Sequence, residues 1–150
     1  MKGILKWPLI VAAVVVILRV VVERAGAADS VANLLSVAAL HTLLVPIYFA
    51  VRIASDGVER PYALLFKLVA AYAVLTRLMI IPTYWMARVY EWTQSRFVGT
   101  WGEDVSPFVG YIAVPFLTAA FWIVASIIFG GIIGSIVIAV GRRMTARSQA

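Results

Sequence analysis

The sequence contains no cysteine and only one histidine, His41. The lack of cysteine excludes thiol catalysis, disulfides, iron–sulfur clusters and Cys-ligated zinc within the chain. One histidine cannot supply a bis-His haem or a multi-His metal site, because each needs at least two imidazoles from one chain. His41 leaves a single axial haem ligand as the most that the chain offers, and we expect no metal site and no cofactor.

Charge is also scarce. Charged residues make up 13% of the 150 positions, compared with roughly 25% in soluble domains. Thirteen basic and seven acidic side chains are too few to cover a 16.4 kDa globule, because a large share of a soluble protein's surface must be polar. Hydrophobic residues form 63% of the sequence, and its mean hydropathy is +0.99. The composition therefore excludes a soluble globular fold and a disordered chain, and it predicts an integral membrane protein.

Acidic residues are outnumbered, which gives a net charge of +6 and an isoelectric point near 10.1. In a soluble protein this excess would indicate nucleic-acid binding, whereas in a membrane protein basic ends set the orientation. The sequence carries no RNA-binding signature and no basic helix with interleaved aromatic residues. We therefore expect a lipid bilayer as partner, and no nucleic acid.

The sequence is rich in long apolar stretches. A hydrocarbon core about 30 Å thick needs roughly 20 helical residues to cross it. Four stretches qualify, and we expect spans at about 7–22, 31–54, 61–92 and 108–140. The connection from 93 to 107 is the only sizeable loop between them. The sequence therefore predicts an all-α integral membrane fold, a four-transmembrane-helix bundle that forms one domain over residues 1–150.

The positive charges predict the orientation of these spans. One side combines both termini with the connection between the second and third spans, and its basic residues are Lys2, Lys6, Arg52, Arg60, Lys67, Arg142, Arg143 and Arg147. The other side has fewer basic residues and more acids: Arg19, Arg24, Arg88, Arg96, Glu23, Asp29, Glu91, Glu103 and Asp104. Because basic loops stay on the cytoplasmic side, we expect both termini in the cytoplasm and a prokaryotic-type inner (cytoplasmic) membrane.

Arg77 is the ionisable residue nearest the middle of a predicted span. Ionisable groups inside a membrane are costly, which makes each one a candidate functional site. All seven acids lie near span ends, so the Arg77 guanidinium needs carbonyls, hydroxyls, water or an anion from outside the chain. Pro82 frees one such carbonyl, that of Leu78. A purely structural guanidinium and an anion-binding site both remain open.

His41 lies on one face of the second span with Tyr48, at the depth predicted for Arg77. Its imidazole has three uses: a proton relay, a haem ligand or an interhelical hydrogen bond. Thr76 and Tyr84 continue the polar side of the third span around Arg77. The candidate ligand-binding residues are therefore Arg77, His41, Tyr84, Tyr48 and Thr76, and no catalytic residue is assigned.

Small residues follow one side of the fourth span: Ser126, Gly130, Gly134 and Gly141. Gly130 and Gly134 form a GxxxG step, which lets two helix backbones approach closely in a membrane. The helix that packs on this stripe belongs either to the same chain or to another subunit. Since little polar exterior is available, we expect a homo-oligomer or a subunit of a membrane complex.

Three functions follow from these features. The first is a non-catalytic structural or accessory subunit, whose interior polar residues serve packing and contacts with partners or lipid. The second is an oligomeric transporter or channel for anions or small molecules, with Arg77 facing a shared axis. The third is a small membrane enzyme that acts on a lipophilic or anionic substrate. The sequence has no Ser–His–acid set, metal cluster or glycine-rich phosphate loop, so we favour a function without catalysis.

Overall fold

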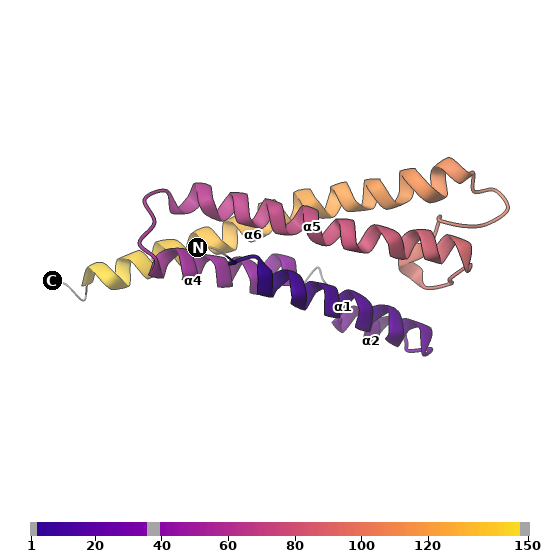
Figure 1. The fold of residues 1–150 in the computed structure, drawn as a ribbon, viewed down its shortest axis with the longest axis horizontal. Helices are drawn as coiled ribbons and strands as arrows, with labels where there is room; N and C mark the ends of the chain where they lie inside the picture. Colours follow the sequence, from indigo (N-terminus) through magenta and orange to yellow (C-terminus); the bar gives the residue numbers. More distant parts are fainter. Residues whose placement is uncertain (1–2, 36–39, 148–150) are drawn as a thin grey trace.

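The computed structural model of the chain describes residues 3–35 and 40–147, apart from the side chains of 41 and 145–147. This part is helical with connecting turns and contains no strand, so the all-α class is confirmed. Its elements are α1 (Lys6–Arg24), α2 (Asp29–Leu34), η1 (Leu40–Leu44), α4 (Val45–Ser55), α5 (Pro61–Val89), η2 (Ser95–Phe97), η3 (Val109–Ala113) and α6 (Val114–Arg147). The helices extend along one long axis (Figure 1).

Two helices within the described ranges are long and apolar enough to cross a membrane, by length and composition: α5, and α6 together with η3. Their mean hydropathies are 2.0 and 2.7. The apolar stretch of α1 is interrupted by charge, because Lys6 begins the helix and Arg19, Glu23 and Arg24 stand in its last two turns. α4 belongs to a shorter apolar helix, Thr42–Ser55.

α5 and α6 run side by side in opposite directions and form the centre of the molecule (Figure 1). α4 packs against both of them, and α1 packs against α5. Two groups of buried side chains hold this arrangement together. The first is Ala12, Val45, Phe49, Ala50, Ile53, Leu65, Leu68, Val69, Tyr72 and Ile138. The second is Val16, Ile80, Tyr84, Ala87, Trp92 and Phe97. Along α5, the first cluster ends at Tyr72 and the second begins at Ile80.

Proline explains the π-helical turns that precede α4 and α6. η1 and η3 are π-helical turns, and each ends two residues before a proline, Pro46 in α4 and Pro115 in α6. Proline has no N–H, and its ring collides with the carbonyl oxygen four residues earlier. A wider π turn moves that carbonyl aside before a regular helix resumes.

α1 (Lys6–Arg24) and α5 (Pro61–Val89) differ from the predicted spans by no more than three residues at their ends, and two other differences are larger. The stretch 31–54 is divided, because α2 ends at Leu34 and α4 begins only at Val45, while residues 36–39 lie outside the described part. Leu35 has ψ 45° and so leaves the helical region. At the other end of the chain, α6 continues through Gly141 to Arg147, beyond the expected end at 140. A glycine inside a helix costs only about 1 kcal/mol relative to alanine, so it does not by itself end one.

Candidate functional site

Arg77 lies on α5 between the two apolar clusters and is 7% exposed. Its guanidinium carbon stands 5.4 Å from the centre of the Trp122 ring on α6, close enough for a cation–π contact. Its Nε and Nη2 atoms are buried and have no hydrogen-bond partner within the described part of the chain. The structure therefore places a buried cation against an aromatic face and leaves one edge of it without an acceptor from these residues.

The other predicted ligand-binding residues have different surroundings. The Thr76 hydroxyl donates to the carbonyls of Tyr72 (2.8 Å) and Ala73 (3.0 Å) in its own helix. Tyr84 packs edge-on against Phe97, with ring centres 5.2 Å apart.

Tyr48 lies on the exposed side of α4 beside Phe49. The backbone of His41 belongs to η1, whereas its side chain lies outside the described residues. The structure thus brings Thr76 next to Arg77 as its neighbour on α5, and it directs Tyr48 towards the exterior.

The small-residue stripe of α6 packs within the chain. Gly134 faces Leu65 of α5 so closely that a Cβ would stand 2.7 Å from a Leu65 methyl group. Gly141 faces Ala54 of α4 less closely, since an added Cβ would stand 3.5 Å from the Cβ of Ala54. Gly130 and Ser126 are buried, and the Ser126 hydroxyl donates to the Trp122 carbonyl at 2.6 Å. These residues let α6 approach both α5 and α4.

Glu23 organises a polar cluster near the end of α1, and it is only 4% exposed. This end of α1 lies away from both termini (Figure 1). Arg19 Nε lies 2.8 Å from Glu23 Oε1. Arg96 donates to Oε2 from both Nε (3.1 Å) and Nη2 (2.6 Å). Arg19 also donates to Asn33 Oδ1 at 2.9 Å, and Gln94 donates to the Glu23 carbonyl at 3.3 Å. The cluster therefore joins α1, α2 and the connection after α5.

Two guanidinium groups share one carboxylate in this cluster. Burial lowers the pKa of Arg96 from its ordinary value, because desolvation disfavours the charged form. The negative charge of Glu23 opposes this lowering, and the positive charge of Arg19 adds to it. The three groups together carry one uncompensated positive charge.

The i, i+4 spacing of Arg19 and Glu23 favours an ion pair on one helix face, but nothing in that spacing indicates that Arg96 completes the cluster. Arg96 is 73 residues away from Glu23, so no local spacing relates the two. The sequence offers one signal for this contact, which is Arg96 itself: an arginine without a matching acid, shortly after the aromatic end of α5.

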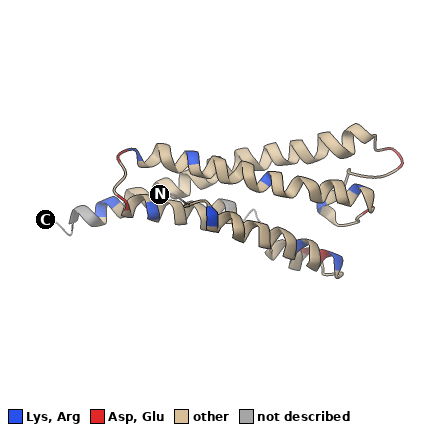
Figure 2. Cartoon of the chain, in the orientation of Figure 1, with Lys and Arg blue, Asp and Glu red and all other residues tan. Residues whose placement is uncertain are grey.

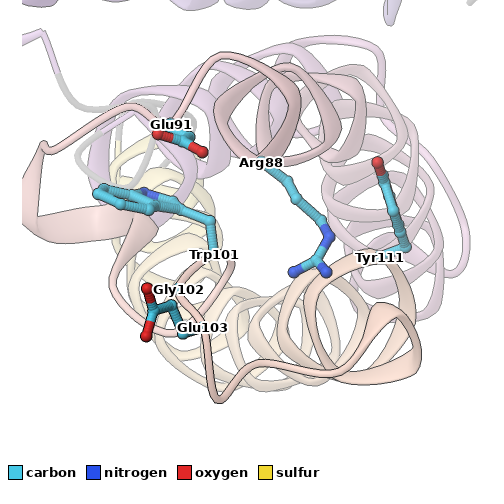
Figure 3. A pocket seen from close by; sticks show the side chains of 6 residues that line it. All are labelled: Arg88, Glu91, Trp101, Gly102, Glu103 and Tyr111. Atoms are coloured by element: carbon cyan, nitrogen blue, oxygen red, sulfur yellow. The ribbon is translucent and has the colours of Figure 1, made fainter.

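An open pocket of about 490 Å³ lies beside this end, lined by Arg88, Glu91, Trp101, Gly102, Glu103 and Tyr111. Figure 3 shows the Glu91 and Glu103 carboxylates on the side of Trp101, and Arg88 beside Tyr111 on the other side. The Arg88 guanidinium donates to the Thr100 carbonyl and, at 3.1 Å, to the Val105 carbonyl. Arg88 therefore fastens the connection 90–108 to α5 and forms one wall of the pocket.

Glu91 holds an uncommon backbone conformation at the rim of this pocket, with φ 49°. The Trp92 N–H donates to the Ala87 carbonyl at 2.9 Å across it, which is a common way for a helix to end. Glycine is the usual residue at such a position, because a left-handed conformation costs other residues about 1 kcal/mol. Glu91 thus occupies a position at which glycine would be less strained.

The described residues hold three polar arrangements: the Arg77 edge between the apolar clusters, the Glu23 cluster, and the mixed-charge pocket around Arg88. No protein-family model, no curated protein and no solved structure matches this chain.

Proposed function

We propose that the chain is a polytopic membrane protein that serves as a non-catalytic structural or accessory subunit. The observation that carries this proposal is the apolar exterior of α6. Only 28% of its apolar stretch is buried within the chain. Large side chains stay exposed along it: Leu117, Phe121, Val124, Ile128, Phe129, Ile132 and Ile136. Soluble monomers rarely expose apolar patches larger than a few hundred Å², so lipid or a partner helix is the fitting environment.

The distribution of charge supports four spans with both termini in the cytoplasm. Figure 2 shows the acidic residues toward the two ends of the long axis, with a mostly uncharged middle. By sequence, the segments around both termini and the α4–α5 turn carry eight basic and two acidic residues. The segments at the opposite end carry four basic and five acidic residues. Because basic segments stay in the cytoplasm, this asymmetry favours both termini in the cytoplasm. The membrane that we propose is a prokaryotic-type cytoplasmic membrane.

The use of the polar side chains supports a structural role. Glu23 joins three segments through its two guanidinium partners. Arg88 binds carbonyls of the connection after α5. The hydroxyls of Thr76, Thr83 and Ser126 donate to carbonyls of their own helices. These groups hold helices and connections in place. A subunit that presents a rigid surface to its partners requires such contacts.

Labelling of single cysteines tests the membrane topology, and the cysteine-free chain provides the unlabelled control. In intact cells, a membrane-impermeant maleimide is expected to label Ser30→Cys and Ser106→Cys, whereas Ser55→Cys reacts only after permeabilisation. All three positions are exposed. If Ser30→Cys and Ser55→Cys react from the same side, the 31–54 stretch does not cross the membrane. If Ser55→Cys and Ser106→Cys share a side, α5 does not cross it.

Native mass spectrometry from a mild uncharged detergent tests the subunit role. We expect the released complex to exceed the 16.4 kDa of one chain, either as a multiple of that mass or with a second protein. A single chain of 16.4 kDa under every gentle release condition would contradict assembly and leave the membrane placement intact.

A second candidate function is an oligomeric transporter or channel for anions or small molecules. The observation that favours it is the buried Arg77, whose Nε and Nη2 find no acceptor within the described residues. A cationic wall at such a position favours anions.

A further inference from the structure

We propose that Arg77 is an oxyanion-binding site, in which carboxylate or phosphate oxygens are held side-on by Nε and Nη2 and arrive from the end of the molecule that carries Arg19 and Arg96. The site goes beyond the proposed subunit role. It depends on the packing around α5 and not on the membrane topology.

The first step concerns which atoms of Arg77 lack a partner. Nε–H and one Nη2–H point in parallel along one edge of the planar guanidinium, and this edge matches the two oxygens of a carboxylate or phosphate. Nε and Nη2 are the two buried Arg77 atoms without a hydrogen-bond partner in the part of the chain that the structure describes. The edge that is suited to an oxyanion is therefore the edge left without an acceptor.

The same edge binds an oxyanion elsewhere in this molecule. Nε and Nη2 of Arg96 both donate to the Glu23 carboxylate, at 3.1 and 2.6 Å. No such acid is within reach of Arg77, because the ion pairs found among the described residues are those of Glu23 with Arg19 and Arg96. The oxyanion that pairs with Arg77 must therefore come from outside the described residues.

Burial makes the missing oxygens costly. A charged group that is removed from water without a partner loses much of its solvation free energy, and the face contact with Trp122 offsets only part of this loss. An oxyanion would restore both charge compensation and two hydrogen bonds. Binding at Arg77 is therefore coupled directly to the stability of the α5–α6 packing.

The surrounding charges favour entry from the Glu23 end. Arg19 and Arg96 share one carboxylate, which leaves one positive charge uncompensated there. Tyr84 of α5 packs against Phe97, the neighbour of Arg96 in the chain. Tyr84 is seven residues from Arg77 on α5, about 10 Å along the helix axis. The uncompensated positive charge thus lies on the Tyr84 side of Arg77, and such a charge raises the local concentration of anions.

Thermal unfolding of the full chain in an uncharged maltoside detergent tests the site. Sodium acetate and sodium phosphate are compared with sodium chloride at equal ionic strength. We expect the oxyanions to raise the wild-type Tm by several degrees over chloride, because a ligand that binds only the folded state stabilises it. Arg77→Gln should weaken the apparent affinity at least tenfold. Lys67→Gln removes the same charge from an exposed position of α5 and should respond like the wild type.

A second arm separates the sources of the oxyanion. Nanodiscs of phosphatidylcholine are compared with nanodiscs that also contain phosphatidylglycerol. A gain with phosphatidylglycerol that Arg77→Gln abolishes assigns the site to a lipid phosphate, and a gain with acetate or phosphate in detergent assigns it to a free oxyanion.

If neither source stabilises the wild type over its control, or if the gain persists in Arg77→Gln, the proposal is overturned. Arg77→Lys covers the case in which the glutamine variant fails to fold. It keeps the charge but lacks the parallel donors, so it should also lose most of the response. The labelling and mass measurements above are unaffected by either result.

Discussion

Replacing Glu23 by alanine is expected to lower the free energy of unfolding by about 3 kcal/mol, because it leaves two largely buried guanidinium groups without their carboxylate. The side chain of Glu23 is 3% exposed, and those of Arg19 and Arg96 are 15% and 17% exposed. The change also removes the ion pair between α1 and the connection that contains η2, and it leaves only the Gln94 hydrogen bond to the backbone carbonyl of residue 23 as a link between them in this cluster. Unfolding by guanidinium chloride in a mild detergent, followed by circular dichroism, measures the loss.

A double substitution separates the charge effect from the loss of packing. Glu23→Gln combined with Arg96→Met removes the carboxylate together with one of its cations. Since removing one partner of a buried ion pair costs more than removing both charges together, we expect the pair of changes to recover at least half of the loss. Glu103→Gln removes an exposed acid at the same end and should change stability by less than about 0.5 kcal/mol. A Glu23→Ala protein as stable as Glu103→Gln would show that the cluster contributes nothing.

The helical class was predictable because it depends on composition. So was α5, since Pro61 supplies a start and a long apolar stretch follows. The interruption of the stretch 31–54 was not predictable in the same way. Hydropathy reports how many apolar residues follow one another, and it contains no information about where the backbone leaves the helical region at Leu35. Pro46 removes one helical hydrogen bond, and the π turn η1 precedes it.

The candidate sites show the same difference between features that are visible in the sequence and features that depend on the fold. Arg77 was predictable because one charged residue in a long apolar run is visible in the sequence itself. The Glu23–Arg96 contact was not, since it depends on how the connection after α5 folds back onto α1. Glu91 carries no glycine or asparagine signal for its left-handed backbone. Each missed feature is a tertiary contact or a local conformation that overrides residue preference.

At Gly110 there is no space for a methyl group. Gly110 is buried in η3, and a Cβ on it would overlap both the Arg88 guanidinium and the Thr100 carbonyl. These two groups are hydrogen-bonded to each other. Substitution by alanine must therefore separate them or displace η3.

Gly110→Ala is expected to reduce stability by about 3 kcal/mol, from overpacking and from the loss of a hydrogen bond to a charged group. Helix propensity alone predicts the opposite sign, since alanine is favoured over glycine by about 1 kcal/mol. Gly141→Ala is the matched control, because its Cβ would meet Ala54 at an ordinary 3.5 Å, so this change should be neutral or stabilising. Chemical unfolding of both variants, with limited proteolysis of the connection 90–108, measures the difference. Equal stability of the two variants would mean that η3 does not pack against Arg88 and Thr100 in the folded protein.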